Sequence, residues 1–141
     1  MSREHILLFE NERGLKRIMT LLLRQAQMRV TGSDSADRAL DIIRSASDEG
    51  DKVSAVIIDV SYPNPEGEKL LINLQEEWAI PSIIVITQYG NEDTIKRSGS
   101  NISLLAAPFE PNELLKSIKT ASFQIDNQEF PSNQCNEEEA P

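Results

Sequence analysis

The sequence contains one cysteine, one histidine and few aromatic residues, and each scarcity excludes a class of protein. Cys135 alone cannot build a disulfide framework, and the single histidine leaves no Ser-His-Asp arrangement for nucleophilic catalysis. We interpret His5 as a solvated residue at the start of a strand. No apolar run approaches the length of a membrane span, and the N-terminus lacks the apolar stretch of a signal peptide. We therefore expect a cytoplasmic protein without a membrane partner.

Basic charge is also scarce. The chain has 14 lysines and arginines against 23 acidic residues, a formal net charge of −9, which argues against nucleic acid as a partner. Its 141 residues are enough for one domain. We place that domain at residues 1–123 and interpret residues 124–141, which are polar and acidic, as a disordered tail. A linker to a further output domain is the alternative reading of that tail.

The chain does have a regular alternation of apolar strands with amphipathic helices. We predict strands at 5–9, 28–32, 55–59, 82–86 and 102–106. A helix follows each strand, the fourth confined to residues 92–99 and the last opened by Pro111. The first helix is expected to bury Leu15, Ile18, Leu22 and Leu23. This alternation predicts an α/β fold, a doubly wound five-stranded parallel sheet covered on both faces.

The ends of these strands carry the candidate site. In a doubly wound sheet, ligands bind outside the carboxyl ends of the strands, near the point where the strand order reverses. Glu10, Asn11 and Glu12 follow the first strand, Asp59 ends the third and Thr87 ends the fourth. Because Asp59 ends a strand predicted to be buried on both faces, its carboxylate must be solvated, paired or bound to a metal. The alternative is a structural carboxylate that caps the loop.

Four segments resemble, in order, those of the response regulator receiver (CheY-like) domain. They are ILLFENERGLK, VIIDVSYPNPEG with proline four and glycine eight positions after Asp59, IIVITQYGNED, and LLAAPFEPNEL. The resemblance covers Ile6 to about Ala121. It implies a flavodoxin-like (βα)5 fold with strand order 2-1-3-4-5. It also implies a non-enzymatic role in two-component (phosphorelay) signalling, with a histidine kinase or phosphotransfer protein as the phosphoryl donor.

The resemblance implies a role for each site residue. Asp59 would be the phosphoacceptor and Thr87 would contact the phosphoryl group. Mg²⁺ would be held by Glu10, Asp59 and the backbone carbonyl of Ser61, with Asn11 as a possible second ligand. A protein partner would dock on the face made by the fourth helix, the fifth strand and the fifth helix. Glu12 is instead expected to open the first helix.

The sequence also departs from the family. Glu10 and Asn11 stand where the family has two adjacent acids, which weakens the expected Mg²⁺ site because glutamate is a methylene longer than aspartate. Ala107 replaces a lysine that clamps the phosphoryl group, and Leu104 replaces the usual aromatic switch residue. Glu10 and Asp59 alone carry a formal charge of −2. The three aspartates and one lysine of the family's usual site sum to the same charge.

Two functions therefore stay open. The domain is either an atypical receiver that is phosphorylated on Asp59, or a phosphorylation-independent pseudo-receiver that acts as a protein-interaction module. A hydrolytic or small-molecule-binding enzyme of similar shape is a weaker third reading. No glycine-rich phosphate loop follows the first strand, and Asp59-Val60-Ser61 lacks the second aspartate that such phosphatases use.

Overall fold

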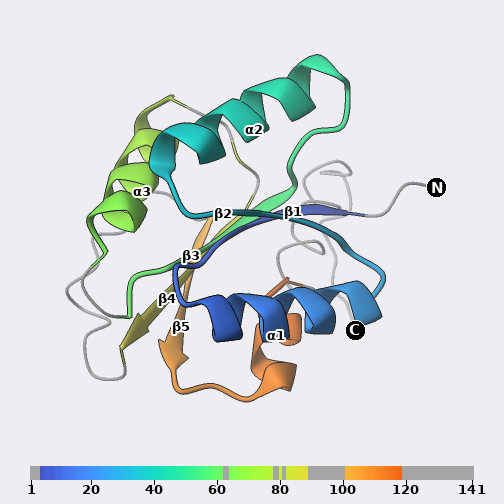
Figure 1. Cartoon of the computed structure of the whole chain (residues 1–141), viewed down its shortest axis with the longest axis vertical. Helices are drawn as coiled ribbons and strands as arrows, with labels where there is room; N and C mark the ends of the chain where they lie inside the picture. The colour runs from blue at the N-terminus through green and yellow to red at the C-terminus, as the bar shows by residue number, and fades with distance from the viewer. Residues whose placement is uncertain (1–3, 62–63, 78–79, 81, 89–100, 119–141) are drawn as a thin grey trace, which may run out of the picture.

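The computed structural model of the chain describes residues 4–61, 64–77, 80, 82–88 and 101–118, and shows one parallel sheet with helices on both faces (Figure 1). The strands run in the order β2-β1-β3-β4-β5, which confirms the predicted fold class and strand order. Their bounds are β1 His5–Phe9, β2 Arg29–Ser33, β3 Ala55–Asp59, β4 Ile83–Gln88 and β5 Ile102–Ala107. The helices are α1 Arg13–Gln25, α2 Ala36–Asp48 and α3 Pro65–Glu77, and residues 111–118 form a further, unlabelled helix.

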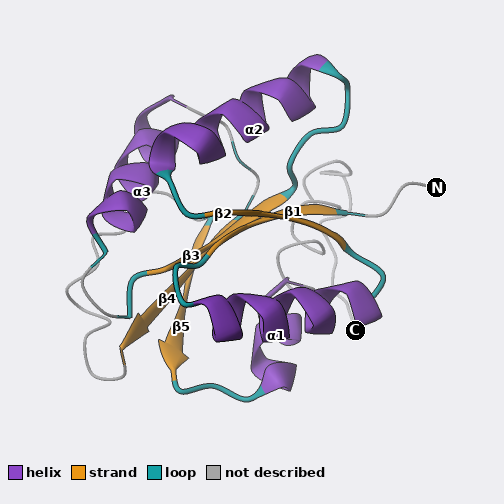
Figure 2. Ribbon diagram, viewed as in Figure 1, coloured by secondary structure: helices purple, strands orange, loops and turns teal. Residues whose placement is uncertain are grey.

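Two helical layers sandwich the sheet. Helices α2 and α3 cover one face, whereas α1 and the helix of residues 111–118 cover the other (Figure 2). Successive residues of β1 alternate between these layers: Leu7 and Phe9 pack towards α2 and α3, and Ile6 and Leu8 pack towards α1. Since both faces are covered, the central strands are apolar throughout, as the sequence predicted. The predicted helix at 92–99 and the segment 124–141 lie outside the described residues.

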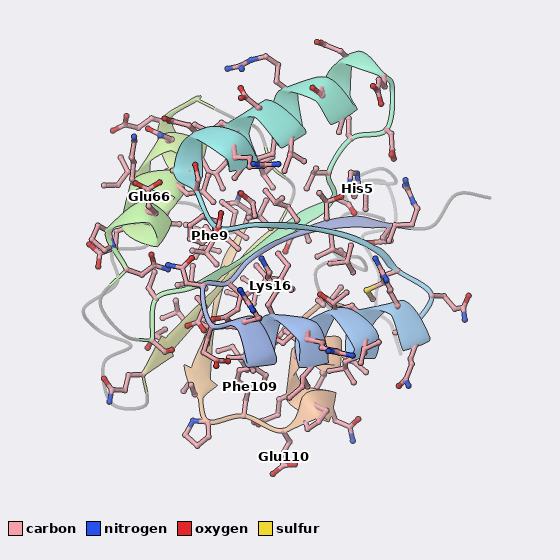
Figure 3. All side chains as sticks on the ribbon, viewed as in Figure 1. His5, Phe9, Lys16, Glu66, Phe109 and Glu110 are labelled. Atoms are coloured by element: carbon pink, nitrogen blue, oxygen red, sulfur yellow. The ribbon has the colours of Figure 1, made fainter. Side chains whose placement is uncertain are left out.

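Side-chain caps fix the starts of the first two helices. The Glu12 carboxylate accepts a hydrogen bond from the Leu15 amide at 2.6 Å, which agrees with the expectation that Glu12 opens the first helix. Ser35 caps α2. The Ala36 amide donates to the Glu66 carboxylate of α3 at 2.7 Å, and Figure 3 shows Glu66 beside the start of α2. A carboxylate at a helix N-terminus is favourable because it faces the positive end of the helix dipole, so this contact joins α2 to α3.

The buried face of α1 differs from the prediction. Ile18 is 62% exposed, so its assignment to the core was wrong. The core residues of this helix are Met19 and Leu23, with Leu15 and Leu22 half-buried beside them. At ~3.6 residues per turn, Ile18 lies about 100° from Met19 around the helix and cannot share its face. A run of apolar residues along α1 therefore did not mark which of them face the sheet.

The environment of His5 also differs from the prediction. Its side chain is only 11% exposed, and its Nε2 lies 2.9 Å from Thr31 Oγ1. Its Nδ1 lies 3.6 Å from Asp51 Oδ2. The two guanidinium nitrogens of Arg29 donate to Asp51 at 2.6 and 2.7 Å, which holds the pKa of that carboxyl below its usual range. His5 is enclosed because β1 lies between β2 and β3, which brings Thr31 of β2 and Asp51, in the segment before β3, against its ring.

No helix within the described part of the chain is both long and apolar enough to cross a membrane.

Candidate functional site

Glu10 and Asp59 meet at the carboxyl edge of the sheet. The strands β1 and β3 are neighbours, and their register pairs Phe9 with Ile58, so the next residue on each strand lies opposite the other. Neighbouring strands are ~4.8 Å apart, close enough for the two carboxyl groups to touch. The side chains of Glu10 and Asp59 lie against each other, and each residue is only 1% exposed.

The closeness of the two buried acids favours the protonated form of Glu10. Burial, followed by the hydrogen bond to Asp59 and the charge of Asp59, raises the pKa of Glu10 from 4.5 to about 8. The Glu12 amide donates to Glu10 Oε2 at 3.2 Å, which offsets only part of this upward shift of the pKa. Glu10 is therefore mainly protonated at neutral pH. A pKa raised in this way works against the expected charge of −2 on Glu10 and Asp59, because burial disfavours a second charge.

The geometry of Asp59 leaves one of its oxygens for chemistry. Its Oδ1 accepts a hydrogen bond from the Ser61 amide at 2.8 Å, which orients the carboxyl group. Among the described residues, Asp59 Oδ2 and Glu10 Oε1 are buried and have no partner apart from the contact between the two acids. Two buried carboxyl oxygens of this kind can share a proton or hold a small, hard cation.

The candidate cation site has two acidic residues, Glu10 and Asp59. No group of three or more His, Cys, Asp or Glu that could hold a metal occurs in the described residues. Mg²⁺ is commonly held by one or two carboxylates with waters completing its shell, so Glu10 and Asp59 suffice in type and number. Asn11 is exposed, and its amide nitrogen donates to Asn64 Oδ1 at 3.1 Å. The residues present therefore fit Mg²⁺, once Glu10 has lost its proton.

Asn64 organises the loop after Asp59, and the sequence analysis did not identify it. It is 3% exposed, and its amide nitrogen donates to the Asp59 carbonyl at 3.0 Å. Its Oδ1 accepts from the Gly67 amide at 3.2 Å, as a residue that caps α3. Asparagine followed by proline at the first helical position was the sequence signal that could have identified it. Asn64 thus joins the backbone of Asp59, the start of α3 and Asn11.

Replacement of Asn64 tests this arrangement. Asn64→Ala removes the cap of α3 and leaves the Asp59 carbonyl without its donor, so we expect a loss of about 2–3 kcal/mol in the free energy of unfolding. Asn64→Asp keeps the acceptor for Gly67 but removes the donor to Asp59, and should lose less. Urea unfolding of both variants measures the difference. If Asn64→Ala unfolds like the wild type, Asn64 does not hold the loop.

Thr87 joins the two acids at the same edge of the sheet. It lies at the end of β4, next to β3, is 1% exposed, and donates from Oγ1 to the Gln88 carbonyl at 3.0 Å. On β5, Ala107 pairs with Gln88 and is half-buried among the residues on the α1 side. Leu104 is half-buried against the α2 and α3 side. These two positions therefore supply only apolar side chains, and no basic group contributes to the shift of the Glu10 pKa.

Solved structures of known proteins share this fold. A response regulator receiver protein from Burkholderia phymatum is 20% identical with a TM-score of 0.68, and covers 84% of this chain and 94% of its own. The chemotaxis protein CheY4 of Vibrio cholerae is 17% identical with a TM-score of 0.68, covering 85% and 99%. A response regulator receiver domain protein from Bacillus halodurans C-125 is 23% identical with a TM-score of 0.67, covering 85% and 97%. A search of curated protein sequences gives no match.

The sequence itself carries the family assignment. The family model described as the response regulator receiver domain matches residues 6–119, most of the 141-residue chain. That match covers β1 from Ile6 onwards and the whole of the other four strands, and it includes both acids and Thr87 at the carboxyl edge of the sheet. The chain therefore belongs to the response regulator receiver domain family of two-component systems.

Proposed function

We propose that this domain is an atypical receiver of a two-component (phosphorelay) pathway and that it accepts a phosphoryl group on Asp59. The observation that carries the proposal is the orientation of this carboxyl group: Oδ1 is held by the Ser61 amide, and Oδ2 has only Glu10 beside it. A nucleophilic oxygen must be held in place and still be available to the incoming group. Asp59 Oδ2 meets both conditions once the contact with Glu10 opens.

The surrounding residues have roles that follow from their positions. Thr87 lies on the neighbouring strand, and its hydroxyl can leave the Gln88 carbonyl to donate to a phosphoryl oxygen. Glu10, Asp59 and the Ser61 carbonyl would hold Mg²⁺, with Asn11 as a possible second ligand, and the ion would supply positive charge against the phosphoryl oxygens. Because the cation must displace the Glu10 proton, its affinity at neutral pH is weakened.

The proposed partners follow from the family. A histidine kinase or a phosphotransfer protein would supply the phosphoryl group, and a protein partner would read the result on the face of the fourth helix, β5 and the fifth helix. Of this face, the structure describes β5 and residues 111–118. The domain would act in the cytoplasm as a signalling module rather than as an enzyme.

A specific observation favours the second candidate, a pseudo-receiver that binds a partner without phosphorylation. Asp59 is 1% exposed, and Glu10, whose pKa is raised to about 8, lies against its carboxyl group. Ala107 offers no charge to stabilise a transferred phosphoryl group. In that case the Glu10–Asp59 pair is a buried structural contact, and the interaction surface is permanently formed.

Amide NMR spectra with Mg²⁺ and beryllofluoride distinguish the two candidates. For the receiver, we expect shifts at Asp59, Ser61 and Thr87 that extend along β5, and their absence in Asp59→Asn. Asp51→Asn, which changes an acid at the opposite edge of the sheet, is the control and should respond like the wild type. An absence of shifts at saturating ligand would leave the pseudo-receiver as the function.

A further inference from the structure

The outer face of α1 is apolar where a solvent-exposed helix is usually polar. Ile18 is 62% exposed and Leu21 is 54% exposed, and Ile72 on α3 is the only other large hydrophobic residue that is so exposed among the described residues. Residues three apart on a helix are neighbours on its surface, so Ile18 and Leu21 form one patch. We call this surface, together with Arg17 and Arg24, the outer face of α1.

This face is also basic in an acidic protein. Helix α1 contains four basic residues and no acidic residue, although the chain as a whole has a net charge of −9. Arg17 and Arg24 lie four residues before and three residues after Leu21, so they flank it on the helix surface. Both are exposed, and neither makes an ion pair with a described residue. Lys16 is separate, because its side chain lies beside Gly32 of β2.

The chain itself contains a segment of complementary chemistry. Residues 124–141 have five acidic residues, no lysine or arginine, and two large apolar residues, Ile125 and Phe130. The described chain leads towards this segment from beside α1, since Leu114 and Ile118 pack in the same cluster as Met19 and Leu23. The six residues from Ile118 to position 124 can span ~20 Å, about the length of α1.

We propose that residues 124–141 bind the outer face of α1 within the same molecule. The acidic side chains would pair with Arg17 and Arg24, and Ile125 or Phe130 would cover the patch of Ile18 and Leu21. Exposed ion pairs are individually weak, so the apolar contact is needed for binding and the charges set its location. The contact would mask α1 from any protein that docks there, whether or not Asp59 is phosphorylated.

The single cysteine makes the test direct. A nitroxide spin label on Cys135 of the full chain reports, through paramagnetic broadening, which amides lie near residues 124–141. We expect loss of signal at residues 17–24 of α1 and little loss along α2. Arg17→Glu combined with Arg24→Glu should restore the α1 signals, as should high salt, which screens exposed charges. Arg38→Glu on α2 reverses one exposed charge elsewhere and should leave the broadening unchanged.

Other outcomes would overturn the proposal. Uniform weak broadening over all helices means that residues 124–141 have no site on α1. Broadening of the α1 signals that survives the double charge reversal means that Arg17 and Arg24 do not direct the segment there, and the proposed contact is rejected. Contact between molecules is tested by mixing two samples. One carries the spin label and has no ¹⁵N, and the other is ¹⁵N-labelled and has no spin label. If the α1 signals are lost only in that mixture and in proportion to concentration, the segment binds a second copy, and the intramolecular contact is rejected.

Discussion

Raising the pH from about 4.5 to about 8 should lower the free energy of unfolding, and Glu10→Gln should remove most of that loss. The pKa of Glu10 is raised by folding, from 4.5 to about 8, so its contribution to stability is complete below about pH 4.5 and is lost as the pH rises through about 8. At ~1.36 kcal/mol per pKa unit, the loss is at most about 5 kcal/mol. Glutamine keeps a donor for Asp59 and cannot ionise, so Glu10→Gln should be the more stable protein above pH 8.

Urea unfolding with a chelator present measures this effect at several pH values without competition from a cation. Glu76→Gln, which neutralises an exposed acid on α3, is the matched control and should follow the wild-type profile. Asp59→Asn should also flatten the profile, because it removes the charge and the partner that help to raise the Glu10 pKa. If Glu10→Gln loses stability with pH as the wild type does, Glu10 does not hold the proton.

Ala107→Lys should increase the rate at which a small phosphodonor phosphorylates Asp59 by about 10²-fold, the usual range for one well-placed donor to a reacting oxyanion. The new ammonium group would start from β5, two strands from Asp59, at the position where the family has its lysine. It would stabilise the transferred phosphoryl group and would favour ionised Glu10. Intact-protein mass spectrometry follows the gain of one phosphoryl group with time.

Ala106→Lys is the control for this substitution. Adjacent residues of a strand point to opposite faces of the sheet. A lysine at position 106 therefore adds the same charge to the same strand, but its side chain points to the other face. Its rate should stay near that of the wild type. Equal rates for wild type and Ala107→Lys, with both proteins folded by circular dichroism, would mean that burial of Asp59, not the missing lysine, limits the reaction.

The fold could be predicted from the sequence because its causes are local. Strand and helix patterns, the turn residues between them and the parallel alternation all repeat over short stretches, and the five strands were placed within about two residues at each end. Successive side chains of a strand point to opposite faces of the sheet, which is why β1 packs against both helical layers. Asp59, Glu10 and Thr87 could be located because the carboxyl ends of parallel strands share one edge.

The errors concern burial and contacts between distant residues. Ile18 was assigned to the core because, in a run of apolar residues, more than one face of the helix could be the buried one. Only the position of the sheet decides which face is buried. His5 was expected in solvent because the sequence does not show that Thr31 and Asp51 lie against its ring. Asn64 was overlooked because its partners, Asn11 and the Asp59 carbonyl, are joined only in the folded chain.

The sequence by itself determined the order of the elements, the sheet type and which acid ends which strand. Only the tertiary structure decided that burial beside Asp59 raises the pKa of Glu10 and that the outer face of α1 is apolar and basic. The physical reason is that a pKa depends on burial and on the neighbouring charge, and exposure depends on what packs against each side chain. Both quantities arise when strands and helices distant in the sequence come together.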